Sequence, residues 1–286
     1  MKKIITTISF ISVIAFGSSS VNATEDTQWR TPAIDNLAIM TLPQGKVVVE
    51  LTPEYAPNHV KRFTSLLKTG HYRGNTFYRV IDGFVAQAGP DGGEGEDKDA
   101  PMLNIESEWP AQDNWPFTLV QNKDLFAEQT GLKNGFAIGR SATDKKAWLT
   151  HCPGVLAMAR SNEPNTATSH FYITNGQAPR YLDRIMTVFG RVVFGMEHVQ
   201  TIKRTSVIEG QAPVDESEFT RIIDFQMMAD LPEKNRINLQ IEDTQSTAFK
   251  AKLADRRARP HAFFYKKPPP VLDVCQVPVR TRLVSN

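Results

Sequence analysis

The feature that most constrains the fold is a series of short β-branched and aromatic segments, each bounded by turn-forming residues. They occupy residues 45–51, 76–81, 84–88, 154–159, 171–174, 187–193 and 222–227. Such lengths and boundaries are typical of strands joined by tight turns. Only two clear helical patterns accompany them, at 57–70 and 196–204. We therefore expect a mainly β protein whose strands form a closed or nearly closed barrel.

Composition divides the 286-residue chain into parts of different character. A basic start, an apolar run and a small-residue stretch predict a secretory signal peptide that is cleaved after Ala23. Alternating apolar residues and then a helical pattern near the C-terminus predict an α/β extension, and a polar, proline-broken stretch predicts a surface insertion. The predicted parts are a signal peptide (1–23), a lead-in (24–44), a barrel (45–229, with an insertion at about 96–150) and a C-terminal extension (230–286).

The charge balance narrows the classes of partner. The formal net charge is +2, and removal of residues 1–23 takes away two lysines and no acidic residue, which leaves zero. A neutral chain offers no electrostatic reason to bind nucleic acid or an anionic membrane. No segment after the signal peptide is apolar for long enough to cross a bilayer. We expect an exported, periplasmic monomer without an integral membrane span.

Two cysteines, Cys152 and Cys275, allow two readings. Export to an oxidising compartment permits a disulfide between them, which would close a long loop and stabilise the fold. Two buried, unpaired thiols are the alternative, and counting free thiols before and after reduction separates the two cases.

Residues 77–89 read Phe-Tyr-Arg-Val-Ile-Asp-Gly-Phe-Val-Ala-Gln-Ala-Gly, two short strands around an Asp-Gly hairpin signal. This stretch resembles the signature of the cyclophilins. Further motifs follow in that family's order at 154–159, 164–173, 182–183 and 188–192. The resemblance covers residues 45–227, interrupted by the insertion. It implies peptidyl-prolyl cis-trans isomerase activity and a closed eight-stranded antiparallel barrel capped by two short helices.

Arg79 is the candidate catalytic residue. Amide resonance keeps an X-Pro bond planar with a barrier of about 18–20 kcal/mol, and rotation breaks no bond. A donor that draws the imide nitrogen lone pair out of conjugation lowers this barrier, and so does an apolar pocket that excludes water. The fixed charge and rigid fork of arginine suit that donor, and we expect no metal or cofactor. Strand alternation predicts that Phe77, Arg79 and Ile81 share one face.

The resemblance also implies a set of substrate-binding residues. Gln87 would hold a substrate carbonyl, and the main chain at Ala159 and Arg160 would pair with the extended substrate. The proline pocket would comprise Phe84, Val85, Tyr172 and Leu182, with His170 as a polar wall residue.

Two positions depart from the family pattern. Tyr181 stands where many cyclophilins have a tryptophan that contacts cyclosporin, and Met186 stands where a pocket histidine is common. The first departure implies weaker cyclosporin binding, and the second implies a more apolar wall.

Other chemistries find little support in the sequence. The six histidines lack metal-ligand spacing, and neither a Gly-x-Ser-x-Gly elbow nor a P-loop occurs. The leading hypothesis is isomerisation of X-Pro bonds in proline-containing exported polypeptides during folding. One alternative is a chaperone or assembly module that binds proline segments with little catalysis, and another is a scaffold in an envelope complex.

Overall fold

The computed structural model describes residues 28–90, 100–111, 114–205 and 215–285. The predicted signal peptide therefore lies outside the described residues. Within the described ranges, no helix has the length and hydropathy needed to traverse a bilayer.

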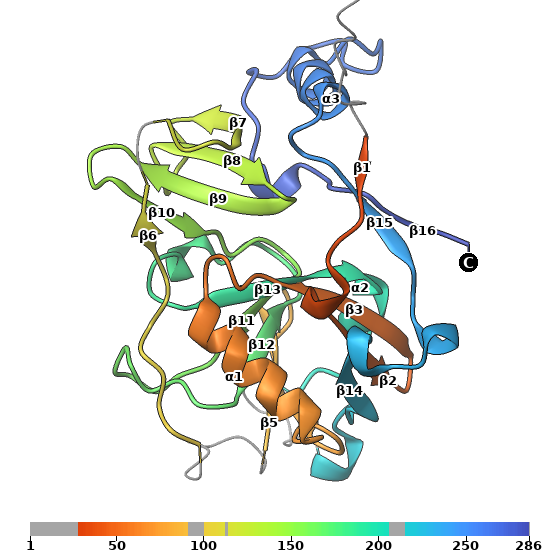
Figure 1. The fold of residues 1–286 in the computed structure, drawn as a ribbon. Helices are drawn as coiled ribbons and strands as arrows, with labels where there is room; N and C mark the ends of the chain where they lie inside the picture. The colour runs from red at the N-terminus through yellow and green to blue at the C-terminus, as the bar shows by residue number, and fades with distance from the viewer. Residues whose placement is uncertain (1–27, 91–99, 112–113, 206–214, 286) are drawn as a thin grey trace, which may run out of the picture.

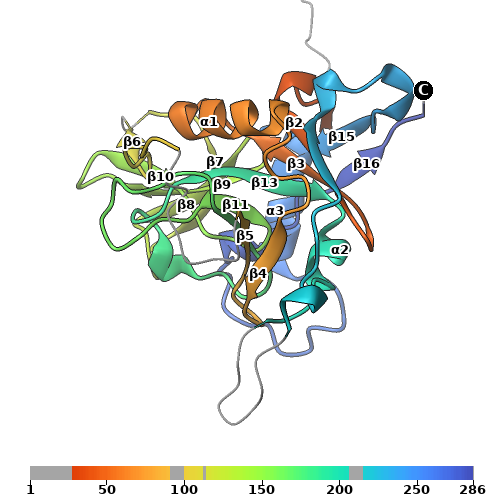
Figure 2. The same cartoon turned by 90° about the horizontal axis from the view of Figure 1, so that it is seen from below.

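The largest element is a curled antiparallel sheet, formed among the described residues by eight strands. Their spatial order is β14 (Asp224–Met227), β2 (Leu37–Leu42), β3 (Gly45–Leu51), β13 (Val188–Phe194), β11 (Val155–Met158), β12 (Phe171–Thr174), β5 (Val85–Gly89) and β4 (Thr76–Val80). Helix α1 (Pro57–Lys68) lies along one side of this sheet (Figure 2) and contacts β14. The short helix α2 (Met196–Gln200) contacts β3. The mainly β architecture with few helices agrees with the prediction.

Full closure of the barrel is not confirmed. Strands β4 and β14 stand at the two ends of the strand order. The chain just before β14 reaches β4 through an isolated bridge between Thr76 and Arg221, and the Phe77 amide donates to the Thr220 carbonyl at 2.9 Å. We describe the sheet as open and curled, with its edges brought together at this bridge.

Strand β2 corrects the predicted start of the sheet. Its residues Leu37–Leu42 belong to the segment predicted as a polar lead-in, yet five of the six are buried and pair with β3. Both faces of β2 are covered, so its residues do not alternate between apolar and polar, and the strand lacks the pattern of a half-exposed one.

The second predicted helix is also shorter than its pattern. It ends at Gln200, and the chain then reaches β4, where the Thr205 hydroxyl accepts from the Val80 amide at 2.7 Å. The same hydroxyl donates to the Tyr78 carbonyl at 2.9 Å. These hydrogen bonds hold the segment after the helix against β4.

An aromatic core fills the interior of the curled sheet. Phe63 of α1 lies 4.9–5.6 Å from the ring centroids of four buried aromatic residues, Tyr72, Phe171, Phe189 and Phe225. Full burial of Phe63 explains the amphipathic pattern of α1.

The predicted insertion is itself a sheet. Among its described residues, five strands follow the order β6 (Trp109–Pro110), β10 (Lys146–Leu149), β9 (Phe136–Ser141), β8 (Gln129–Lys133) and β7 (Thr118–Asn122). A third sheet orders β1 (Trp29–Arg30), β15 (Leu239–Glu242) and β16 (Thr281–Leu283), and helix α3 (Thr247–Ala258) follows β15. Figure 1 shows these parts together at one end of the molecule, above the curled sheet. The chain also has 3-10 turns at η1 (Ile34–Asn36), η3 (Arg180–Leu182), η4 (Glu216–Glu218), η5 (Met228–Asp230), η6 (Glu233–Asn235) and η7 (Val274–Gln276).

A second apolar cluster joins these parts to the curled sheet. It contains Val120 and Ile138 of the insertion, Phe249 of α3, and Val155 and Tyr172 of the curled sheet. Within the same cluster, Cys152 and Cys275 form a disulfide with a Cα–Cα distance of 4.8 Å. The insertion and the extension therefore share a core with the sheet and are covalently tied to it.

Glu106 of the insertion caps helix α1. The preceding Ala56 offers no side-chain cap, and both Glu106 oxygens instead accept from the Asn58 amide at 3.1 Å. Glu106 Oε2 also accepts from the His59 amide at 3.0 Å and lies 2.7 Å from His59 Nδ1. Burial opposes ionisation, but the hydrogen bonds from His59 and Asn58 outweigh it and lower the pKa of Glu106. A carboxylate at this end is also favoured by the helix dipole.

Candidate active site

Arg79 lies on β4 with its side chain exposed. Between Thr76 and Arg79 the pairing with β5 shifts, so that one extra residue stands on β4. This bulge corrects the expected alternation, because Phe77 and Val80 are both fully buried while Arg79 is exposed. The bulge thus directs the Arg79 side chain to solvent, whereas Phe77 and Val80 of the same strand are buried in the core.

A chain of hydrogen bonds fixes the arginine. Its Nη1 donates to Gln87 Oε1 at 3.0 Å from the paired position on β5. Gln87 Nε2 donates to the Tyr78 hydroxyl at 2.6 Å, and that oxygen lies 2.8 Å from His170 Nδ1. Burial raises the pKa of Tyr78 to about 12, so its hydroxyl remains protonated at neutral pH. Within the described part of the chain, the guanidinium of Arg79 forms no ion pair with a carboxylate.

Apolar side chains lie next to the arginine. The Phe84 ring centroid is 5.7 Å from Arg79 Cζ, and the Phe84 ring stacks on Tyr181 at 6.3 Å. Val85 and Tyr172 are buried in the second apolar cluster, and Met186 packs against it together with Phe84 and Ala159. Leu182 is half-buried on η3, beside Tyr181, which is 64% exposed. Of these predicted pocket residues, Phe84 thus lies next to Arg79, and Phe84 and Met186 both pack against the cluster that contains Val85 and Tyr172.

Ala159 and Arg160 follow β11. The Ala159 amide already donates to the His170 carbonyl at 2.8 Å, which leaves its carbonyl for a main-chain partner. The guanidinium of Arg160 donates to the Ile185 carbonyl at 2.9 and 3.2 Å and to the Ser161 carbonyl at 2.8 Å. The Arg160 side chain therefore holds two loops together.

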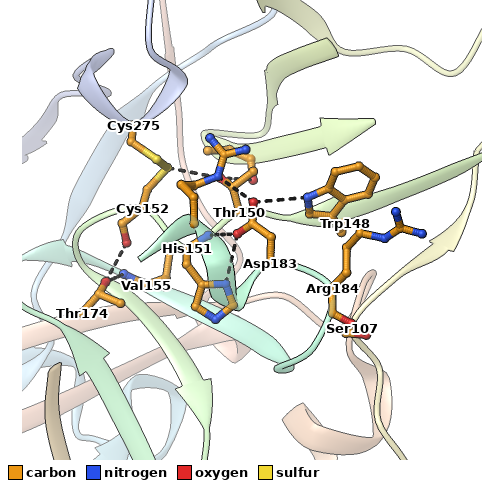
Figure 3. Close-up of polar contacts among 12 residues, drawn as sticks. Ser107, Trp148, Thr150, His151, Cys152, Val155, Thr174, Asp183, Arg184 and Cys275 are labelled. Carbon is orange, nitrogen blue, oxygen red and sulfur yellow. Dashed lines mark hydrogen bonds and ion pairs between the residues drawn. A yellow bond between two sulfur atoms is a disulfide. The ribbon is translucent and has the colours of Figure 1, made fainter. Parts of the chain in front are cut away.

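A buried polar network surrounds His151 and Asp183 (Figure 3). It contacts Tyr172 through His151. Asp183 Oδ1 accepts from the His151 amide at 2.8 Å and lies 3.2 Å from His151 Nδ1. Asp183 Oδ2 accepts from Arg180 Nε at 2.6 Å and from Trp148 Nε1 at 3.4 Å. His151 Nε2 lies 2.9 Å from the Tyr172 hydroxyl, so a histidine protonated at Nδ1 accepts a hydrogen bond from that hydroxyl at Nε2. The network fixes Tyr172 and the segment that carries Tyr181 and Leu182.

Sequence reasoning missed this network. In the sequence, His151 is one of six histidines without metal-ligand spacing, and Asp183 belongs to a family motif. The partners lie 32 residues apart for His151 and Asp183, and 56 for Asp124 and Arg180. A local pattern holds no signal for contacts at such separations.

Asp183→Asn is expected to lower the free energy of unfolding by about 3 kcal/mol, because it leaves Arg180 with a weakened partner in a buried site. The side chains of Asp183 and Arg180 are each only 5% exposed. The new amide would also direct N–H groups toward donors of His151, Arg180 or Trp148. Urea denaturation followed by tryptophan fluorescence measures the change.

Asp144→Asn is the matched control. Asp144 pairs with Arg184 at 2.9 Å, but its side chain is 45% exposed, so the same substitution should cost less than about 1 kcal/mol. Equal shifts of the urea midpoint for the two variants would contradict the importance assigned to the buried network.

The family model for cyclophilin type peptidyl-prolyl cis-trans isomerases matches residues 37–226, beginning at the first residue of β2. A probable peptidyl-prolyl cis-trans isomerase of Brucella suis is 33% identical over 207 residues, which cover 71% of this chain and 89% of the relative. A peptidyl-prolyl cis-trans isomerase-like protein of Aspergillus fumigatus is 31% identical and covers 62% of this chain and 88% of its own length.

The comparison with solved structures extends beyond the shared sheet. A crystal structure of a cyclophilin from Hirschia baltica superposes with a TM-score of 0.71 at 28% identity. The match covers 94% of this chain and 98% of that chain, so it includes the insertion and the extension as well as the curled sheet.

Proposed function

The chain belongs to the cyclophilin type peptidyl-prolyl cis-trans isomerases, and from this premise we propose that it accelerates X-Pro rotation in exported polypeptides during folding, with Arg79 as the catalytic residue. The observation that carries the proposal is the position of Arg79. Its guanidinium is exposed, donates a hydrogen bond to Gln87 and lies next to the Phe84 ring.

In this mechanism the arginine acts on the twisted bond. As rotation proceeds, the imide nitrogen loses conjugation and becomes a hydrogen-bond acceptor, and an Arg79 N–H that is not donated to Gln87 stabilises it there. Gln87 holds the guanidinium in place beforehand, so no reorganisation is required at the moment of rotation. Lowering the barrier by ~5 kcal/mol accelerates the reaction by roughly several thousandfold.

The apolar residues supply the second contribution. Phe84, Met186, Leu182 and the covered Tyr172 would hold the proline ring and exclude water from the bond. Since water stabilises the planar, polar amide, its exclusion favours the twisted form, and it strengthens the hydrogen bond from Arg79. No bond is made or broken, so the mechanism requires neither a nucleophile nor a cofactor.

Two observations support the exported setting. Residues 1–23 have the layout of a secretory signal, and Cys152 and Cys275 form a disulfide, which persists in oxidising compartments. We propose that the mature chain works in the periplasm. Cell fractionation should find the processed chain in the periplasmic extract, and a full-length chain in the cytosol would reject this placement.

The activity is tested with a peptide whose trans-prolyl form alone is cleaved by a protease. The wild-type chain should raise the rate of the slow cis phase in proportion to its concentration. The gain should persist in the presence of a chelator, because no metal takes part. A slow phase identical to that of the uncatalysed peptide would reject the proposed function.

Tyr181→Trp is expected to tighten cyclosporin binding by about tenfold, or ~1.4 kcal/mol. The indole would add aromatic area and an N–H donor beside Phe84, on a side chain that is 64% exposed. Inhibition of the isomerase by titrated cyclosporin measures the change. Tyr181→Phe keeps a ring without the donor and should bring no gain; an unchanged inhibition constant for Tyr181→Trp would show that other pocket differences dominate.

A further inference from the structure

A hollow that we call the side groove has a volume of about 790 Å³ and lies between the insertion and the extension. One wall is the loop between β7 and β8 in the insertion, and the opposite wall is residues 271–276 of the extension. The base includes Pro153, residues 176–178 of the loop that leads into η3, and Arg180, the first residue of η3. The groove thus exists only because both additional segments pack against the curled sheet.

The side groove exposes an unusual amount of apolar surface. Leu125 is 94% exposed, Val271 is 54% exposed and Phe126 is 48% exposed, and all three line it. Single exposed apolar side chains are common on protein surfaces, but several around one hollow indicate a binding site. The three residues come from two segments far apart in the sequence.

The base of the side groove is in backbone contact with the turn that carries Phe84. The Gln177 amide donates to the Gly83 carbonyl, and the Asn175 amide donates to the Phe84 carbonyl, both at 3.1 Å. A side chain on Gly176 would meet the Gly83 Cα at 2.4 Å, so the two segments are in direct backbone contact. Gly176 and Gln177 thus line the groove and also contact the turn that carries Phe84.

Arg180 connects the groove to the buried network. Its guanidinium lies 5.3 Å from the Phe126 ring centroid, and its Nη2 donates to Asp124 at 3.0 Å. Its Nε donates to Asp183, and Tyr181, the next residue, stacks on Phe84. The rim of the groove is therefore held at a fixed position relative to the proline site.

We propose that the side groove binds apolar residues of the polypeptide substrate that flank the isomerised proline. Gly176 and Gln177 at the base of the groove contact Gly83, the residue before Phe84, so an extended substrate that continues past Phe84 in this direction would enter the groove. Unfolded polypeptides expose such apolar residues, whereas folded proteins bury them. The inference rests on the proposed isomerase function and adds a preference for long, apolar substrates.

The test uses the full chain with Leu125→Ser and Val271→Ser combined. Three peptides share an Ala-Ala-Pro-Phe centre: the tetrapeptide itself, a dodecapeptide with leucines three to five residues from the proline, and the same dodecapeptide with serines there. We expect the wild-type kcat/KM to be about fivefold higher for the leucine dodecapeptide than for the serine one. In the double variant this ratio should fall to about one, while the tetrapeptide rate stays unchanged.

Leu283→Ser is the matched control, because Leu283 is also an exposed leucine of the added segments, at 59%, but does not line the groove. It should keep the wild-type ratio. Two results, each with normal turnover of the tetrapeptide, would overturn the inference and leave the proposed function standing. One is equal kcat/KM of the wild type for the leucine and serine dodecapeptides. The other is a higher kcat/KM for the leucine dodecapeptide that the double variant preserves. No turnover of any peptide would overturn both. A wild-type dimer in sedimentation that the double variant dissociates would place a second copy in the groove and overturn the inference.

Discussion

Arg79→Ala is expected to lower kcat/KM for X-Pro isomerisation by about a hundredfold, which corresponds to ~2.7 kcal/mol of transition-state stabilisation. Removal of one preorganised donor from a developing charge costs other enzymes between about 10²- and 10³-fold. Arg79 is exposed, and the hydrogen bond that it loses goes to Gln87 at the surface. The folded structure should therefore remain, and circular dichroism spectra of the two proteins should coincide.

Arg79→Lys and Arg73→Ala complete this experiment. Lysine keeps the charge but not the planar fork, so it cannot donate to Gln87 and to the imide nitrogen with the same geometry. We therefore expect a loss of kcat/KM smaller than that of Arg79→Ala. Arg73 is an exposed arginine that pairs with Asp224, whereas Arg79 contacts Gln87 and Phe84. Removal of the Arg73 side chain should therefore leave kcat/KM unchanged. A fully active Arg79→Ala protein would reject the role assigned to this residue.

Cys152→Ser combined with Cys275→Ser is expected to lower the free energy of unfolding by about 4 kcal/mol. The disulfide spans 123 residues, and the chain-entropy argument gives about 5 kcal/mol for a loop of this length. Residual structure in the unfolded chain reduces that figure. The bridge also holds η7 of the extension against the second apolar cluster, so its loss should loosen the contact between extension and sheet.

Reduction of the wild type is the internal control for this prediction. Urea midpoints are measured for both proteins with and without dithiothreitol. The wild type should fall to the midpoint of the double variant when reduced, whereas the variant should not respond to the reductant. A wild-type midpoint that reduction leaves unchanged would contradict the stabilising role of the bridge.

The hairpin and the position of Arg79 were predictable because local patterns carry them. Asp82-Gly83 marks the turn, and the strand segments on either side are short and bounded. Strand β2 was missed because both of its faces are covered, so that Leu37, Ala38 and Ile39 are all buried in succession. The bulge before Arg79 was missed because strand alternation alone does not reveal an extra residue in the pairing.

The insertion and the buried network depend on contacts between distant segments. The strands of the insertion gain their apolar partners from α3 and from the curled sheet, so Val120 and Ile138 lack a clear pattern of their own. The buried network joins separate segments of the chain, because Asp183 contacts Trp148, His151 and Arg180. The side groove likewise arises from segments around residues 125 and 271, which no short motif connects.

The most direct measurement of the central claim is exchange between the cis and trans resonances of an Ala-Pro peptide at equilibrium, followed by nuclear magnetic resonance. It separates catalysis from simple binding, because both are seen in the same spectra. The account predicts exchange cross-peaks with the wild-type chain, and shifted resonances with almost no cross-peaks with Arg79→Ala. Cross-peaks of equal strength for both proteins, or a wild type that binds the peptide without any exchange, would contradict it.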